Sequence, residues 1–160
     1  MPDTTSADLS PRDVLARFHR AMLDKSADDL ADLYAADALH EFPFLGFPGM
    51  PERYRGREEV RAGYRAAWGT SPAQPQRIHD VLVHESIDPE VITVEQVVAG
   101  TVTTTGQAFS FPGLLVLRVR NGLIVHVRDY MDGLRVAHAM DRLTAVVAGL
   151  GASRMEETQP

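Results

Sequence analysis

Residues 121–132 read Asn-Gly-Leu-Ile-Val-His-Val-Arg-Asp-Tyr-Met-Asp, and the architecture of the chain can be worked out from this stretch. It opens on Asn-Gly, the dipeptide that best tolerates the positive φ angles of a type I′ hairpin turn. The runs on either side, 113–120 and 123–132, are rich in Leu and Val. We therefore predict a long β-hairpin whose second strand ends in charged side chains.

The second strand of this hairpin places a carboxylate among apolar side chains. Because side chains alternate along a strand, one face carries Val125, Val127, Asp129 and Met131. The opposite face carries Ile124, His126, Arg128, Tyr130 and Asp132. If the first face lines a pocket, desolvation disfavours the charged form of Asp129 and suits it to carry a proton. The alternative is a strand end in solvent, with Asp129 solvated or paired with an arginine.

Composition narrows the class of protein. A chain of 160 residues, with 44% hydrophobic and 24% charged residues, is typical of a single soluble globular domain. The net charge of −6 argues against nucleic acid or an anionic membrane as a partner. The absence of cysteine excludes disulfides, thiol catalysis and thiolate metal sites. With no signal-peptide pattern and no membrane-spanning run, we expect a cytoplasmic location.

The first half of the chain carries helix signals. Ser10-Pro11-Arg12-Asp13 combines an N-cap serine, a first-turn proline and a capping-box aspartate. A second signal at 26–29 precedes an apolar stripe of Leu30, Leu33 and Tyr34. We predict a third helix over 57–68, with Trp68 on its apolar side. Their apolar side chains are most simply explained as core.

A short strand at 38–44 leads into a loop rich in aromatic, Pro and Gly residues at 45–51. The large apolar side chains of this loop, Leu45, Phe47 and Met50, should not extend freely into water, so we expect the loop to lie over a cavity or against a partner subunit. From residue 77 the pattern changes to strands, predicted at 78–84, 91–103, 107–120 and 123–132.

The element order predicts one α+β domain over residues 10–148, preceded by a disordered N-terminus at 1–9. A closing helix is predicted over 134–147, and residues 149–160 are expected to be a disordered tail. Helices on one face of a curved antiparallel sheet form a cone, and the mouth of such a cone suits a small molecule.

Few side chains outside the hairpin suggest chemistry. The six histidines are scattered without the spacing of a helical metal motif, so we expect no metal site. His40 alternates with Phe42, so it is either a half-buried strand-end residue or a catalytic partner. Glu95 and Gln96 interrupt an apolar run and point to opposite faces, so only one of them can face the cavity.

These residues together resemble the nuclear transport factor 2-like superfamily. The resemblance rests on Arg-Gly-Arg-Glu-Glu-Val at 55–60, on the long strands and on the ending at 122–132, and it covers roughly residues 10–143. The most similar members are SnoaL-like polyketide cyclases, ketosteroid isomerases and limonene-type epoxide hydrolases. The resemblance implies a strongly curved mixed or antiparallel sheet packed against three N-terminal helices. It also implies a homodimer formed through the outer face of the sheet, which carries Ile124 and His126.

The functional residues of these relatives carry over only in part. The run Arg-Asp-Tyr-Met-Asp at 128–132 resembles the hydrolase Arg-Asp-Tyr-Phe-Asp, which implies that Asp129 is a catalytic acid. The hydrolase's other two charged residues fall on Gln96 and Val98, and the isomerase base falls on Phe42. Neither complete constellation is present. SnoaL-like cyclases use a single Asp for acid–base ring closure, and they fit the remaining residues best.

We therefore predict a cofactor-independent isomerase or cyclase that acts on a hydrophobic carbonyl or polyketide-type compound. Asp129 would transfer the proton, while His40 and Gln96 would hydrogen-bond the carbonyl oxygen. The apolar pocket would be lined by Phe42, Phe44, Phe47, Trp68, Val98, Phe109, Phe111, Leu115, Val127 and Met131. The alternatives are a cyclase that only shapes its substrate, a hydrophobic binding module, and an epoxide hydrolase.

Overall fold

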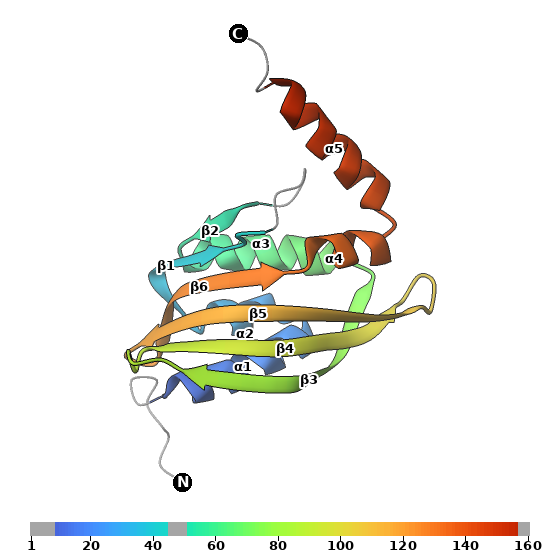
Figure 1. Ribbon diagram of the computed structural model, residues 1–160. Helices are drawn as coiled ribbons and strands as arrows, with labels where there is room; N and C mark the ends of the chain where they lie inside the picture. The colour runs from blue at the N-terminus through green and yellow to red at the C-terminus, as the bar shows by residue number, and fades with distance from the viewer. Residues whose placement is uncertain (1–8, 45–50, 157–160) are drawn as a thin grey trace.

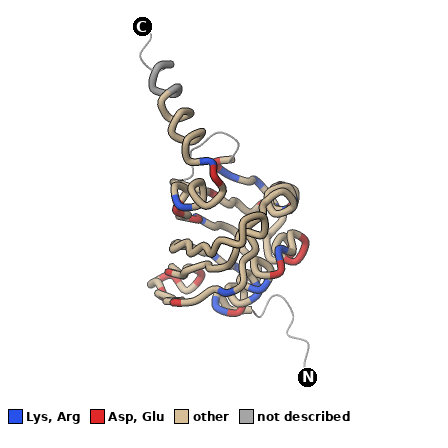
Figure 2. The backbone as a smooth tube through the Cα atoms, turned by 90° about the vertical axis from the view of Figure 1, so that its right-hand side faces the viewer, with Lys and Arg blue, Asp and Glu red and all other residues tan. Residues whose placement is uncertain are grey.

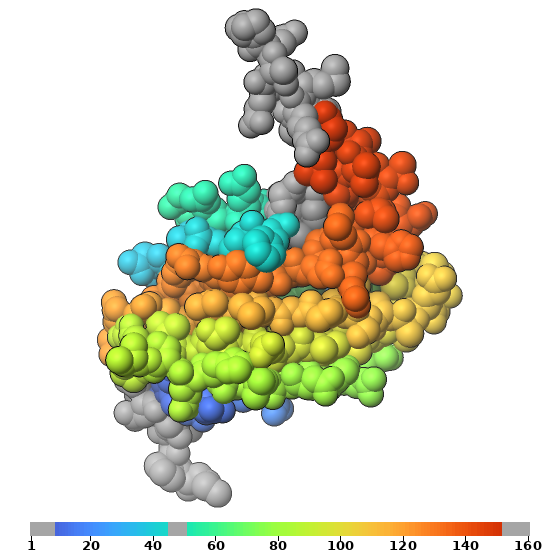
Figure 3. All heavy atoms as spheres, viewed as in Figure 1, coloured from blue at the N-terminus to red at the C-terminus, as the bar shows by residue number. Residues whose placement is uncertain are grey.

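The computed structural model describes residues 9–44 and 51–156 (Figure 1). Three helices, α1 (Pro11–Asp24), α2 (Ala27–Ala31) and α3 (Arg57–Thr70), lie behind one face of a sheet. In Figure 3 the side chains of β3–β6 form the surface on the opposite face. This is the α+β arrangement that the sequence predicts.

The sheet has six strands in the order β2-β1-β6-β5-β4-β3. Their bounds are β1 (Tyr34–Glu41), β2 (Arg53–Arg55), β3 (Ala73–Glu85), β4 (Val91–Val102), β5 (Ala108–Arg120) and β6 (Leu123–Met131). β1 pairs with β6 in parallel, and the other neighbours are antiparallel, so the sheet is mixed. Because β1 runs beside β6, residues near position 40 lie next to residues near position 127.

The helix starts follow the predicted caps. The Ser10 hydroxyl accepts from the backbone N–H of Asp13 in a capping box, and Ser26 caps α2. The second helix is shorter than predicted, because α2 ends at Ala31 and Tyr34 begins β1. The Ile124 amide donates to the Leu33 carbonyl, so pairing with β6 draws this segment out of the helix.

The hairpin turn is confirmed, with φ values of 51° at Asn121 and 72° at Gly122. The pairing of β5 with β6 shifts by one residue between Arg118 and Val119. As a result Ile124 is fully buried in the core, and its predicted place on the outer face is wrong. The alternation holds beyond the shift, where Val127 and Asp129 face inward.

The C-terminal region forms two helices where one was expected. α4 (Gly133–Ala139) ends where Asp141 adopts a left-handed φ of 55°, and α5 (Leu143–Glu156) follows. α5 therefore occupies much of the stretch predicted as a disordered tail, and it projects from the body (Figure 1). Figure 2 shows no charge along the first turns of this helix, and residues 143–151 contain no charged residue. Among the described residues, no helix is long and apolar enough to cross a membrane.

The core lies between the helices and the concave face of the sheet. Its fully buried large side chains come from both layers, including Val14, Phe18, Leu30, Val60, Val94, Leu117, Ile124 and Val127. Each such side chain contributes about 1.5–3 kcal/mol through burial. The polar groups described next are therefore attached to a close-packed frame.

Candidate active site

Asp129 lies on the inner face of β6, where the alternation predicts it. Its side chain is 11% exposed, and it pairs across the sheet with Leu115. Every buried side-chain nitrogen or oxygen in the described part of the chain has a hydrogen-bond partner. No described residue hydrogen-bonds the Asp129 carboxylate, whose nearest charged or imidazole partner is His40 Nε2 at 3.9 Å from Oδ2. The carboxylate oxygens therefore keep accessible surface and can meet a ligand.

His40 sits beside Asp129 but has no exposed surface. The parallel pairing of β1 with β6 sets it opposite Val127. Its Nδ1 lies 2.8 Å from the Tyr34 hydroxyl, and its Nε2 lies 3.3 Å from the Tyr64 hydroxyl. Both ring nitrogens are thus occupied by phenol groups. His40 can influence a ligand only through Tyr64 or Asp129.

The two tyrosines remain protonated. Burial raises the pKa of Tyr34 well above its usual range, and the nearby negative charge of Asp129 raises it further. The pKa of Tyr64 is raised in the same way, first by burial and then by Asp129. Both groups are therefore neutral phenols near pH 7 and can donate hydrogen bonds.

The hydrogen-bond roles of the His40 nitrogens follow from the burial of Tyr34. Tyr34 has no exposed surface, and the hydroxyl finds its described partner in His40 Nδ1. A buried phenol needs an acceptor for its proton, so Nδ1 accepts and the ring hydrogen lies on Nε2. That hydrogen points toward the Tyr64 oxygen, which leaves the Tyr64 O–H free to donate elsewhere.

Aromatic rings surround this cluster. The Phe42 ring lies 4.6 Å from the His40 ring between centroids and 5.8 Å from the Tyr54 ring. Tyr64 contacts Trp68 at 4.7 Å between centroids. Phe42 and Trp68 therefore pack around the His40–Tyr64 pair.

Three predicted pocket residues lie elsewhere. Phe44 is 73% exposed and packs against Tyr130, a residue of the outer face, because β1 ends at Glu41 and its alternation stops there. Leu115 and Val127 belong to the packed core and have almost no accessible surface. These three are not lining residues of an inner pocket, and Phe47 lies outside the described residues.

The remaining predicted lining residues lie on the inner face farther along the sheet. Phe109 and Phe111 stack at 4.6 Å between ring centroids. Val98 pairs with Phe111, and Met131 pairs with Gly113. Phe109 is 7% exposed, and Phe111, Val98 and Met131 are half-buried.

Gln96 faces inward from β4, but it does not join the Asp129 cluster. It is 6% exposed, and its Oε1 lies 2.6 Å from Nε2 of His19 on α1. The register matches Gln96 to Gly113 and Asp129 to Leu115, so the two residues are two strands and two positions apart. With ordinary strand spacing and rise, their Cα atoms are separated by roughly 12 Å. The Gln96 side chain therefore belongs to a separate contact with His19 and not to the group formed by Asp129, His40 and Tyr64.

The two other carboxylates that the sequence suggested lie on the outer face. Glu41 pairs with His126 at 2.7 Å, which lowers the Glu41 pKa, and Glu95 pairs with His84 at 2.7 Å. A groove of about 720 Å³ is lined by residues of this face, among them Val97, Leu114 and Tyr130, and also by Phe44 and Gln96. Another cavity of about 310 Å³ lies between α1 and α2. Asp129 lines neither of them.

Sequence reasoning missed Tyr34, Tyr64 and His19 as site residues. Tyr64 falls on the inner stripe of α3 with Val60, and His19 follows Leu15 by one helical turn, so both carried an inward signal. Tyr34 was placed in the core as part of a helical stripe, but its contact with His40 depends on its position in β1, which the sequence did not predict. In the described residues no group of three metal-ligating side chains converges.

Comparisons with known proteins agree with this architecture. A family model described as "SnoaL-like domain" matches residues 15–127. The "Uncharacterized PhzA/B-like protein" of Pseudomonas aeruginosa is 27% identical over 141 residues, which cover 86% of this chain and 94% of the relative. The structure of a "Putative Isomerase" from Bacillus subtilis matches with a TM-score of 0.74 and 25% identity, over 89% of this chain and 97% of that one. A "putative polyketide cyclase" from Pseudomonas putida matches with a TM-score of 0.65, and at 16% identity over 82% of this chain and 98% of that one it shows the fold alone.

Proposed function

Because the chain belongs to the SnoaL-like domain family, we propose that it is an enzyme of isomerase or cyclase type. Its substrate would be a bulky, apolar carbonyl compound, and no metal or organic cofactor would take part. One observation carries this proposal: an accessible carboxylate, Asp129, lies at the end of a chain of hydrogen-bonding groups formed by the buried Tyr34 and His40 and the half-buried Tyr64.

Asp129 acts as the base. Its carboxylate removes a proton from the carbon next to the substrate carbonyl, and the electron pair of that C–H bond forms the C=C bond of an enolate. Where the substrate has a C=C bond beside that carbon, the enolate extends over it, and protonated Asp129 returns the proton to the far carbon as the double bond moves, which gives an isomer. In a cyclase the enolate carbon attacks an electrophilic carbon of the same molecule, and Asp129 protonates the oxygen that receives the displaced electron pair.

Tyr64 stabilises the enolate oxygen. Its O–H is free to donate, because His40 Nε2–H supplies the hydrogen bond to its oxygen. Tyr34 fixes the His40 ring from the other side. His40 is thus a positioning residue, in place of the direct contact that the sequence suggested. Donors held in a water-poor site favour developing negative charge, and one such donor contributes about 10²–10³ in rate.

The substrate would lie along the inner face between Asp129 and Gln96. Half-buried apolar side chains on this path are Trp68, Val98, Phe111 and Met131. They favour a flat, apolar molecule and exclude water around the reacting carbon.

The test is exchange of an acidic C–H proton, followed by NMR in deuterated water with 2-tetralone, a bicyclic enolisable ketone. The wild-type protein should accelerate exchange, and Asp129→Asn should lower that rate by about 10²-fold or more. The matched control is Asp132→Asn, since Asp132 is three residues away and Asn also caps α4. Full exchange by Asp129→Asn, or no acceleration by the wild type with ketones of one, two or three rings, would contradict the proposal.

A binding module, or a cyclase that acts by shape alone, is the second candidate. The 3.9 Å approach of Asp129 to His40 favours it, because that pair also suits a purely structural role. Unchanged ligand binding and turnover in Asp129→Asn would support this reading. Epoxide opening has less support, since Glu41 and Glu95 lie on the outer face.

We also propose that two copies pair through the outer face of the sheet. The groove lined by Val97, Leu114 and Tyr130 supports this assembly, because it offers apolar surface for burial. Light scattering at micromolar concentration should give twice the mass of one chain, and a monomer would contradict it.

A further inference from the structure

His19 and Gln96 form a second polar point on the inner face. The His19 side chain reaches from α1 to the sheet, and its Nε2 lies 2.6 Å from Gln96 Oε1. Apolar groups surround the pair on the sheet: Val94 on the same strand is fully buried, and Val98 is half-buried. A buried amide without a function would cost free energy here, so its presence calls for an explanation.

The His19 ring is neutral near pH 7. Burial lowers its pKa, and the hydrogen bond to Gln96 offsets that shift only in part. The Nε2–H group of the neutral ring therefore donates to Gln96 Oε1. This bond fixes which way the amide faces, because it engages the oxygen and leaves the NH₂ group at the other end.

The Gln96 NH₂ group is available to a ligand. No described residue accepts a hydrogen bond from it, yet all buried side-chain nitrogens in the described part of the chain are partnered. The NH₂ group must therefore keep accessible surface. It lies on the same face as Asp129, with roughly 12 Å between the two Cα atoms.

We propose that Gln96, held by His19, determines specificity by donating a hydrogen bond to an acceptor oxygen at the far end of the substrate. The inference rests on the proposed function and narrows its substrate class. The substrate would be an elongated, at least bicyclic apolar molecule with two oxygen functions. One is the carbonyl oxygen next to the carbon that Asp129 deprotonates, and the other lies across the ring system. His19 acts here as a positioning residue.

The experiment compares two fluorescent naphthols of nearly equal shape. Both carry the hydroxyl that imitates an enol, and they differ in the opposite substituent: 6-acetyl-2-naphthol has an acceptor oxygen, and 6-isopropyl-2-naphthol has none. Wild-type protein should bind the acetyl compound about fivefold more tightly, the effect of one net hydrogen bond. Gln96→Met should bind the two compounds equally.

The variants separate positioning from folding. His19→Phe should lose most of the preference, whereas His19→Gln should keep it because its amide can still donate to Gln96. Glu95→Gln, on the opposite face of the same strand, should behave as wild type. Melting temperatures show whether each variant is folded. The comparison of the two naphthols on the wild-type protein does not depend on any variant.

The outcomes distinguish this inference from the proposed function. Asp129→Asn should change the affinity for both naphthols alike, because both present the same hydroxyl. Equal binding of the two compounds by wild type would overturn the role of Gln96 and leave the role of Asp129 standing. If neither compound bound, the inner site would be overturned and this inference with it.

Discussion

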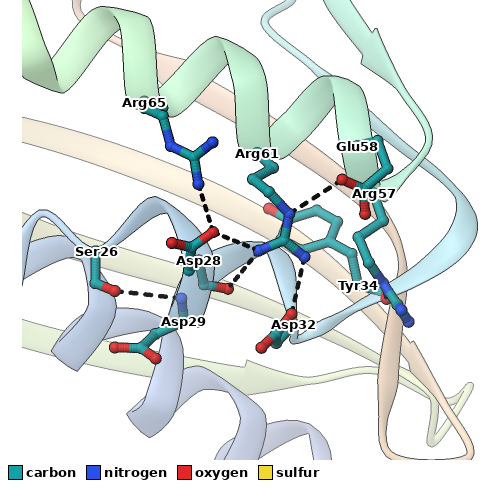
Figure 4. A network of polar contacts seen from close by, with 9 residues as sticks. All are labelled: Ser26, Asp28, Asp29, Asp32, Tyr34, Arg57, Glu58, Arg61 and Arg65. Carbon is teal, nitrogen blue, oxygen red and sulfur yellow. Dashed lines mark hydrogen bonds and ion pairs between the residues drawn. The ribbon is translucent and has the colours of Figure 1, made fainter.

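Two polar clusters lie on either side of Tyr34, and they differ in the kind of contact that holds them: one consists of ion pairs, and the other of hydrogen bonds to neutral phenols. On the solvent side, Arg61 of α3 contacts Asp28, Asp32 and Glu58 at 2.7, 2.9 and 3.1 Å (Figure 4). On the inner side, His40 contacts two neutral phenols and lies near one carboxylate. Tyr34 belongs to both, because its carbonyl accepts from Arg57 and its hydroxyl donates to His40.

The difference shows that density of charge does not mark the reactive site. The acidic partners of Arg61 are mostly exposed, so water and salt screen the network, and its role is to join α2 to α3. The same contacts raise the pKa of Arg61. This shift has no effect on its charge, because an arginine is protonated at any working pH. The inner cluster has a single carboxylate, but its hydrogen bonds are electrostatically stronger because they are shielded from water.

The largest difference in stability between the two clusters is expected from His40→Leu. This change leaves the Tyr34 and Tyr64 hydroxyls without their common partner, and each unsatisfied buried group costs roughly 1–3 kcal/mol. The free energy of unfolding should fall by about 3 kcal/mol, measured by urea denaturation. A loss no greater than that of Arg61→Gln would show that the two clusters hold the fold equally.

Tyr64→Phe should separate chemistry from stability. Removal of the donor at the enolate oxygen should slow exchange of 2-tetralone protons by about 10²-fold. Tyr54→Phe is the matched control, since the Tyr54 ring lies 5.9 Å from that of Tyr64 between centroids but makes no described hydrogen bond to His40. Equal rates for the two variants would remove Tyr64 from the mechanism.

Much of the inner cluster's frame could be predicted from local sequence. The Asn-Gly turn fixes the start of β6, and strand period then places Asp129 inside, because both signals act within one hairpin. The two wrong placements on these strands also have local causes. A one-residue shift in pairing brought Ile124 into the core, and the end of β1 at Glu41 released Phe44 to the outer face.

The partners of His40 could not be predicted in the same way. His40, Tyr64 and Asp129 come from β1, α3 and β6, and they meet through the parallel pairing of β1 with β6 and the packing of α3 against β1. A periodicity argument treats each element alone, so it could offer His40 as a catalytic partner without showing that phenols occupy both nitrogens. Gln96 was assigned to the same carbonyl for the same reason.

The pH dependence of stability tests His19, a half-buried imidazole of α1 that contacts the sheet. Its pKa is lowered by burial, so below pH 6.5 the unfolded chain binds this proton more readily than the folded one. Stability should therefore fall as pH drops from 7.5 to 5.5, and His19→Gln should lose less over that window. Urea denaturation at the two pH values measures the difference. An equal loss in both proteins would mean that His19 is not desolvated.

The smallest effect is expected from Arg61→Gln, and its salt dependence carries the information. Substitution removes attraction to three exposed carboxylates, so stability should fall only slightly at low ionic strength. In 1 M salt the Debye length is about 3 Å, and the difference from wild type should nearly vanish. The loss caused by His40→Leu should be the same at both salt concentrations, because neutral hydrogen bonds out of contact with water are not screened. If salt diminished both losses alike, the inner cluster would be held by exposed charge, and the separate role proposed for Tyr34, His40 and Tyr64 would be wrong.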